Sequence, residues 1–406
     1  MLVTLVPLFD ENLTVKAYSL FAQKKNYFLS PNLLGTGFHD GAAYVDGLEV
    51  ISSMGIETLS EDKEVFVPVS NISIYSDINA QCEAPHDRIV LLIDNTILPQ
   101  ESYINRLKEL RADGFRFAVR KLEVSQFEDY REILSMADYI FLNFKKIDIS
   151  KAKIYFSKVY PNIKLCAVNI DDMEIFEKLK ADGGYQFYEG KFFRTPINEG
   201  EHDVSPLKVN YIQLLNMVNG PEFELTEAAD VIGRDTALVI SLLKMVNRMA
   251  INSKITSIRH AAAMLGEREL RKWLTTAVAG ELYMDKPNEI TRLSLLRAKF
   301  AENLAPVFSM AIKSSELFLM GLFSVLDVIL DMPMEEALEV VKVSPAISDA
   351  LVNGKGDLAL VLEFMKRYEN ADWQEVSRLM VIHKIEMDQV YKAYVDSLTW
   401  YRDICN

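Results

Sequence analysis

Cysteine, histidine and cationic side chains are all scarce in this chain of 406 residues. The three cysteines, Cys82, Cys166 and Cys405, have no paired spacing, so we expect neither a disulfide framework nor a cysteine-based zinc site. Lysine and arginine together number 44 against 58 aspartates and glutamates, which leaves a net charge of -14. Binding to nucleic acid or to an anionic membrane needs clustered cations. We therefore expect neither partner, and favour proteins or small molecules.

Long hydrophobic runs are also missing, although 50% of the residues are hydrophobic. The apolar start, MLVTLVPLFDENLTV, lacks the basic region and the small-residue cleavage site of a signal peptide. No apolar run reaches the length of about 20 residues that a membrane-spanning helix needs. A cytoplasmic protein is predicted. The chain is long enough for two domains with sizeable cores.

The first half of the chain, up to about Pro196, alternates β-rich runs with helical runs. The β-rich runs are LVTLVPLF, EVFVPV, IVLLID, FRFAV, YIFLNF, IKLCAVN and YQFY. Two of the helical runs end at Gly114 and Gly183, where a left-handed residue lets the chain turn into the next strand. Nearly all strand residues are apolar, which is typical of a parallel sheet covered by helices. This pattern predicts either a (β/α) barrel or a doubly wound sheet.

The second half, from Ser205 onward, has helical spacing throughout, as in ALVISLLKMVNRMA and LRKWLTTAVAGELY. The segment INEGEHDVSPL between the halves is polar and contains Gly and Pro, which favours a linker. We therefore predict an α/β domain at residues 1–197, a linker at 198–206 and an all-α domain at 207–406.

Two segments carry a resemblance to known families. GKFFRTP, Gly190 to Pro196, and the opening VPLFDENLTVKAYSLF resemble the EAL domains that hydrolyse cyclic di-GMP. The segment IGRDTALVISLLKMVNRMAINSKITSIRHAAAMLGERELRKWL resembles the HDOD domain. Together these resemblances imply an N-terminal TIM-like (β/α) barrel of EAL type, followed by an α-helical HDOD domain similar to the HD superfamily.

The EAL resemblance implies metal ions held by carboxylates and an Asn at the carboxyl ends of barrel strands, because hydrolysis of a phosphodiester needs such metals and hard oxygen ligands. In this chain the implied active-site positions are occupied mostly by other residue types: Tyr18, Leu92, Asn95, Arg120, Lys121, Phe141, Asn143, Cys166, Asn169 and Glu189. Arg120 and Lys121 stand where the family has paired aspartates, and two cations would repel a divalent ion. We expect the metal site, and with it the hydrolytic activity, to be lost.

A simpler interpretation of several of these positions also stands. Tyr18, Phe141 and Cys166 fill the barrel as ordinary core residues. Arg120 and Lys121 form a strand end that is solvated or paired with acids. Asp94, next to Asn95, starts a loop as an Asx turn.

The HDOD half is expected to lack metal chemistry as well. HD-superfamily hydrolases hold metals with His and Asp, and the segment FLMGLFSVLDVIL carries Ser324 and Val325 at the corresponding positions. The chain has five histidines, and none lies between residues 261 and 382. No cofactor is therefore expected.

These observations favour a catalytically inactive signal-transduction or scaffold protein that acts through protein partners. A local group of cations on the acidic chain, Lys244, Arg248, Lys254 and Arg259, is the candidate surface for an acidic partner. The alternative is a metal-free receptor for cyclic di-GMP or another nucleotide, with Arg120 and Lys121 on the phosphates. The sequence leaves the partner's identity and a homodimer open.

Overall fold

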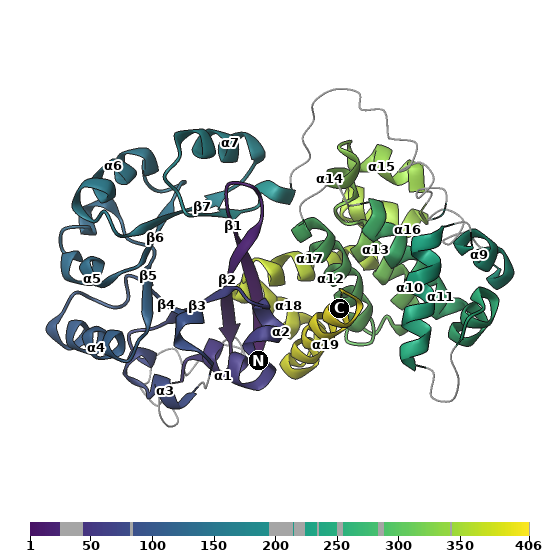
Figure 1. The fold of residues 1–406 in the computed structure, drawn as a ribbon, viewed down its shortest axis with the longest axis horizontal. Coiled ribbons are helices and arrows are strands. Elements are labelled where there is room, and N and C mark those ends of the chain that lie inside the picture. Colours follow the sequence, from purple (N-terminus) through teal and green to yellow (C-terminus); the bar gives the residue numbers. More distant parts are fainter. Residues whose placement is uncertain are drawn as a thin grey trace. The chain divides into compact units, whose positions relative to one another are not determined.

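The computed structural model describes residues 1–24, 44–81, 84–194, 214, 224–233, 235–249, 255–282, 288–341 and 343–405. The chain divides into two compact units (Figure 1). We call Met1–Thr195, Leu296–Gly321 and Leu360–Asn406 the barrel unit, and Pro196–Leu295 with Leu322–Ala359 the helical unit. Residues 198–206, the predicted linker, lie outside the described residues.

The barrel unit is built on a closed barrel in the strand order β1-β2-β3-β4-β5-β6-β7-β8. Strand β1 is antiparallel to both of its neighbours, and all other neighbouring strands are parallel. The strands are β1 Leu2–Phe9, β2 Val15–Gln23, β3 Glu64–Val69, β4 Ile89–Ile93, β5 Arg116–Val119, β6 Tyr139–Asn143, β7 Lys164–Ile170 and β8 Phe187–Gly190. Of the two predicted alternatives, the structure has the barrel.

Helices cover the outer face of the parallel strands (Figure 1). They are α1 Asp46–Met54, α2 Ile56–Ser60, α3 Ile78–Gln81, α4 Glu101–Ala112, α5 Arg131–Met136, α6 Ile149–Val159 and α7 Met173–Asp182. Asp148 and Asp172 cap α6 and α7 by accepting hydrogen bonds from the backbone N–H groups of Lys151 and Ile175. Gly114 and Gly183 have φ values of 95° and 66°, as expected for glycines at which a helix gives way to a strand.

Apolar side chains fill the middle of the barrel. This interior cluster comprises Leu8, Ala17, Phe66, Val90, Leu92, Ala118, Tyr139, Phe141, Cys166, Val168 and Phe187. The ring of Phe66 lies 5.1 Å from that of Tyr139 and 5.4 Å from that of Phe141. Towards the amino ends of the strands, Glu64 accepts hydrogen bonds from Arg116 and from the Tyr139 hydroxyl, at 2.6 and 2.8 Å. The interior is therefore packed, and its polar groups lie towards its ends.

Residues from the C-terminal half of the sequence complete the barrel unit. Strand β1 pairs with β8 only at Phe9 and Tyr188, which leaves an edge of β1 without a strand beside it. The Val3 N–H donates a hydrogen bond to the hydroxyl of Tyr368, 3.1 Å away on α17 (Asp357–Glu369). Residues 296–321 and 360–406, which the sequence pattern assigned to the helical domain, thus cluster with the barrel. Helical periodicity identifies a buried face but does not say which unit covers that face.

An ion triad ties these C-terminal residues to the end of the barrel. Glu369 accepts two hydrogen bonds from Arg297 on α12 (Asn288–Leu304), both at 2.7 Å, and one from Arg194, at 3.1 Å. The three side chains are 12%, 5% and 18% exposed for Glu369, Arg297 and Arg194. Burial, the largest influence, would raise the pKa of Glu369, but the two guanidinium groups together hold it below its ordinary value.

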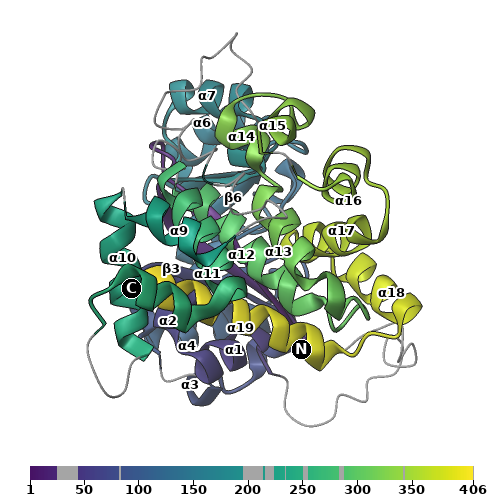
Figure 2. The same cartoon turned by 90° about the vertical axis from the view of Figure 1, so that its right-hand side faces the viewer.

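The other α-helices among the described residues are α9 Leu225–Ile232, α10 Thr236–Met249, α11 Ile258–Leu282, α13 Ser314–Phe323, α14 Leu326–Leu330, α15 Met334–Val341, α16 Pro345–Ser348, α18 Trp373–His383 and α19 Met387–Cys405. Figure 2 shows α9, α10 and α11 of the helical unit. Asp235 accepts a hydrogen bond from the Leu238 N–H at the start of α10, and Asn247 bonds the backbone of Ile255 before α11. No helix in the described ranges is long and apolar enough to cross a membrane.

Candidate functional site

Polar side chains collect at the carboxyl end of the barrel. Successive residues of a strand point to opposite faces, so each residue two positions beyond an interior residue also faces inward. Counting on from Ala17, Leu92, Ala118, Phe141 and Phe187 in the interior cluster gives the next inward positions. These are Ser19, Asp94, Arg120, Asn143 and Glu189. Ser19 lies in the middle of β2, where it pairs with Phe66, so we give the name mouth site to the other four.

Asp94 and Lys121 form an ion pair at the rim of the mouth site. The Lys121 Nζ lies 2.9 Å from Asp94 Oδ2. The other oxygen of Asp94 accepts hydrogen bonds from the backbone and the hydroxyl of Thr96, at 3.0 and 2.7 Å, which makes the Asx turn. Burial alone would raise the pKa of Asp94, but the bonds from Thr96 and Lys121 outweigh it and lower that pKa. Asp94 and Lys121 therefore neutralise each other, as expected if Lys121 at the strand end is paired with an acid.

Among the residues that the structure describes, Arg120 has no such ion pair. Its guanidinium carbon lies 5.1 Å from the centre of the Phe21 ring on β2. Burial lowers the pKa of Arg120, while the nearby carboxylates of Asp94 and Glu189 act in the opposite direction. Arginine stays charged in proteins, so the site holds a positive charge. Among the described residues its Nε is buried without a hydrogen-bond partner.

Glu189 lies within the field of Arg120, and Ser19 lies deeper in the barrel. Burial raises the pKa of the Glu189 carboxyl to about 7, and the charge of Arg120 only partly opposes this rise. The Ser19 hydroxyl is buried, and within the described part of the chain it has no hydrogen-bond partner. Polar atoms left in this state are rare in native proteins and mark a place for water or a ligand. Arg120, Asn143 and Glu189 are partly exposed, so solvent reaches the site.

The apolar residues at predicted site positions belong to the packed interior. Leu92, Phe141 and Cys166 are 0%, 5% and 0% exposed, and all three are members of the interior cluster. Burial raises the pKa of the Cys166 thiol well above its ordinary value, so the thiol stays protonated and unreactive. All three residues fill the barrel, as the simpler interpretation expected for Phe141 and Cys166.

Tyr18 requires a correction. It lies between the inward positions Ala17 and Ser19, so the alternation of β2 turns its side chain to the outer face of the barrel. Tyr18 is 5% exposed and fills the layer outside the strands. The inward residue nearest to it on the carboxyl side is Ser19, which the sequence interpretation missed. The run AYSLFA does not alternate between apolar and polar residues, so the sequence does not show which of its side chains face the barrel interior.

Three amide side chains among the predicted positions are placed in loops or at strand ends. The backbone carbonyl oxygen of Asn95 accepts a hydrogen bond from the Tyr130 hydroxyl, at 3.3 Å. Asn143 Oδ1 accepts a hydrogen bond from the Lys145 N–H, at 3.0 Å. Asn169 is exposed and has a φ of 65° where the register of β7 shifts against β8. Of the three, only Asn143 belongs to the mouth site.

The predicted positions in the helical unit are spread over several elements. Ser324 and Val325 lie between α13 and α14, and Val325 is buried. Lys244 and Arg248 are exposed one turn apart on α10, which brings two of the predicted surface cations together. Arg259 forms an ion pair with Asp230 at 3.0 Å, and residue 254 lies outside the described ranges.

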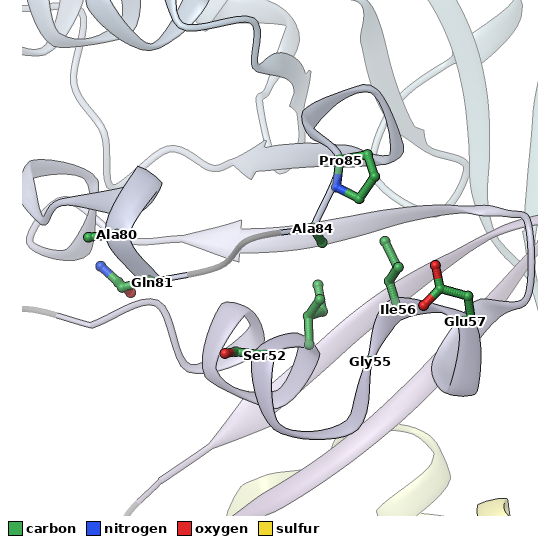
Figure 3. A pocket seen from close by; sticks show the side chains of 9 residues that line it. Ser52, Gly55, Ile56, Glu57, Ala80, Gln81, Ala84 and Pro85 are labelled. Carbon is green, nitrogen blue, oxygen red and sulfur yellow. The ribbon is translucent and has the colours of Figure 1, made fainter.

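A hollow of about 400 Å³ opens among the helices outside the strands (Figure 3). The helices α1, α2 and α3 contribute most of its lining, which is Ile51, Ser52, Gly55, Ile56, Glu57, Ala80, Gln81, Ala84 and Pro85. Its polar groups are engaged: Gln81 accepts a hydrogen bond from the Val45 N–H, and Glu57 pairs with Arg88. The hollow therefore offers less for binding than the mouth site does.

The EAL resemblance implies a carboxylate cluster that the sequence of this chain was expected to lack. In the part of the chain that the structure describes, no group of three or more His, Cys, Asp or Glu side chains is arranged to hold a metal ion. At the mouth site Asp94 is paired with Lys121, and Glu189 lies within the field of Arg120. The arrangement is suited to holding an anion rather than a divalent cation.

Residues 205–344 match the family model of the HDOD domain. The chain contains an HDOD domain. Together with the closed barrel, this match confirms the predicted fold class, a (β/α) barrel followed by an α-helical HDOD domain.

Comparison with curated proteins finds relatives of similar length. The uncharacterized protein YuxH of Bacillus subtilis (strain 168) is 26% identical over 407 residues, which cover 98% of this chain and 97% of YuxH. The cyclic di-GMP phosphodiesterase CdgJ of Vibrio cholerae is 27% identical over 325 residues, covering 79% of this chain and 74% of CdgJ.

Among solved structures, the EAL enzyme Bd1971 in its cAMP-bound form matches 46% of this chain and 60% of its own, with 14% identity and a TM-score of 0.33. The predicted HDOD domain agrees with the family match to residues 205–344.

Proposed function

We propose that this EAL–HDOD chain is a signalling protein that acts by binding and does not hydrolyse cyclic di-GMP. The relative CdgJ is named as a cyclic di-GMP phosphodiesterase, which supports a role in the same signalling chemistry. The absence of paired cysteine spacing favours work in the reducing cytoplasm.

The main support for this proposal is the type of residue found inside the barrel and at the carboxyl ends of its strands. Metal-assisted attack on a phosphodiester needs several hard oxygen ligands around the ion. Here Leu92, Phe141 and Cys166 pack the barrel interior, while Arg120 and Lys121 bring positive charge to its carboxyl end. A divalent ion would have to displace Lys121 from Asp94 and overcome the field of Arg120. Both requirements weaken metal binding.

Calorimetric titration of the full chain with Mn²⁺ tests the loss of the metal site. We expect only weak heats that disappear at higher ionic strength, since the net charge of -14 attracts cations without a specific site. Asp94→Asn should leave these heats unchanged. Saturable binding of one or two ions per chain, reduced by Asp94→Asn, would show that a metal centre remains.

The binding role assigned to the helical unit is contact with a protein partner. Lys244 and Arg248 project from the same face of α10 and are exposed on an acidic chain, so they can steer an acidic partner. Arg259 contributes less to the attraction of an acidic partner, because it forms an ion pair with Asp230.

A second candidate function is a metal-free receptor for cyclic di-GMP or another nucleotide. The observation that favours it is Arg120 at the carboxyl end of the barrel, whose Nε is buried without a hydrogen-bond partner among the described residues. Guanidinium groups bind phosphate through paired N–H donors, and Arg120 has its Nε free for this purpose among the described residues. Lys121 is the weaker ligand, because Asp94 already neutralises it.

A further inference from the structure

Exposed apolar side chains gather at the carboxyl end of the barrel. Ile72 and Tyr75 follow β3, and Leu98, Val124 and Phe144 follow β4, β5 and β6. Each lies between the end of its strand and the next helix, and each is 37% to 58% exposed. Because the four strands are neighbours in the barrel, their loops follow one another along the same end. We call these five residues the apolar arc.

The loops that carry the apolar arc are fixed by polar contacts. Arg106 on α4 donates hydrogen bonds to the backbone carbonyl groups of Ile74 and Ser76, at 3.0 and 2.9 Å, and so holds the loop after β3. Lys121 after β5 pairs with Asp94 after β4, at 2.9 Å. The arc is therefore a preformed surface, and binding to it would cost little conformational entropy.

Arg120 supplies a positive charge at the same end of the barrel. In barrel order β5 is separated from β2 by two strands, yet the guanidinium carbon of Arg120 lies 5.1 Å from the centre of the Phe21 ring on β2. The Arg120 side chain therefore reaches across the end of the barrel. It is partly exposed, and its Nε has no hydrogen-bond partner in the described part of the chain. A guanidinium over a ring keeps N–H groups that suit a carboxylate.

We propose that the carboxyl end of the barrel is a second docking surface for a protein partner. A segment of the partner packs apolar side chains on the apolar arc and places one carboxylate, from an Asp or a Glu, on Arg120. The inference goes beyond the proposed function, which assigns partner contact to Lys244 and Arg248 in the helical unit.

The apolar arc determines the kind of occupant. A free phosphate or a nucleotide on Arg120 would leave most of the arc in water, whereas a protein segment buries it, and exposed apolar patches are typical of protein interfaces. The net charge of -14 repels a strongly acidic partner. A mainly apolar segment with one acidic residue therefore fits both the arc and the single cation.

Selection from a phage-displayed library of random peptides on the immobilised full chain tests this surface. We expect enriched peptides to share an Asp or Glu flanked by aromatic or aliphatic residues. A synthetic peptide of the most enriched sequence is then measured by fluorescence anisotropy. Arg120→Gln should weaken its binding by about tenfold or more, because a paired charge is lost. Changing the acid of the peptide to its amide should weaken binding to the native chain equally, and should add little on Arg120→Gln.

Variants of the apolar arc test the second half of the surface. Leu98→Ser and Val124→Ser should each weaken the peptide by about tenfold, through lost apolar burial. The matched control is Ile154→Ser on α6, an exposed apolar residue outside the arc that should keep native affinity. Since all three residues are exposed, the variants should keep the native melting temperature.

The outcomes separate this inference from the proposed functions. If no peptide is enriched on the native chain over Arg120→Gln, or if the enriched peptides lack an acid, the docking surface is wrong. Binding that survives the arc variants also contradicts it. Peptides lost with Lys244→Glu and Arg248→Glu, but not with Arg120→Gln, would support the partner surface on α10 alone. Binding of cyclic di-GMP through Arg120 without any such peptide would support the receptor instead.

Discussion

Glu369→Gln is expected to lower the free energy of unfolding by about 3 to 5 kcal/mol, because it removes the carboxylate that pairs with two largely buried guanidinium groups. Glu369 bonds Arg297 twice and Arg194 once, and all three side chains are at most 18% exposed. Thermal or urea unfolding of the full chain measures the loss. Retention of the native melting temperature would contradict it.

Glu363→Gln is the matched control, on the same helix as Glu369. Its carboxylate pairs with Arg367, and these side chains are 50% and 46% exposed. A solvated pair of this kind contributes less than about 1 kcal/mol, so the variant should unfold almost like the native chain.

The triad also makes stability depend on pH. The two arginines hold the pKa of Glu369 below its ordinary value, so its contribution is fully present above that ordinary value, about 4.3. The contribution disappears as the pH falls through the lowered value. The native chain should therefore exceed Glu369→Gln in stability at neutral pH and lose this advantage below about pH 4. An unchanged difference between pH 7 and pH 3 would contradict the assignment.

Phe66→Ala is expected to cost about 3 to 5 kcal/mol, through lost burial and the cavity it leaves. The Phe66 ring is fully buried and contacts the rings of Tyr139, Phe141 and Phe187, at centroid distances of 5.1, 5.4 and 6.3 Å. Denaturant unfolding followed by tyrosine fluorescence measures the loss. A cost below about 1 kcal/mol would show that the interior is loosely packed.

Phe144→Ala provides the comparison. Phe144 follows β6 and is 37% exposed, so its removal should change stability by no more than about 0.5 kcal/mol. A pair of phenylalanines that differ mainly in burial separates the effect of packing from the effect of residue type.

The barrel strands were predictable because their apolar runs are short and bounded by polar residues. IVLLID contains β4, Ile89–Ile93, and YIFLNF contains β6, Tyr139–Asn143. Closure into a barrel was not predictable from periodicity alone. It depends on β1 pairing antiparallel with β2 and β8, and the second of these pairings joins Phe9 to Tyr188. Phe9 and Tyr188 are far apart in the sequence, and a local sequence pattern does not indicate which distant strands pair.

The mouth site was only partly predictable. Arg120 and Glu189 were singled out because they stand at positions where the EAL resemblance implies other residues, and the structure places both at the carboxyl end. Tyr18 was assigned to the site although Ser19 faces inward, because β2 is apolar on both faces and its register cannot be read from the sequence. The charge state of Glu189 depends on burial by residues from several strands, which sequence spacing does not show.

Hydrolysis of cyclic di-GMP tests the central claim most directly. The full chain is incubated with cyclic di-GMP and either Mg²⁺ or Mn²⁺, and the products are separated by anion-exchange chromatography. Among the described residues, no group of side chains at the carboxyl ends of the strands is arranged to bind a metal ion. We therefore predict that the linear product forms no faster than in a sample without protein. Formation of linear product in proportion to protein concentration, and its suppression by EDTA, would contradict this account.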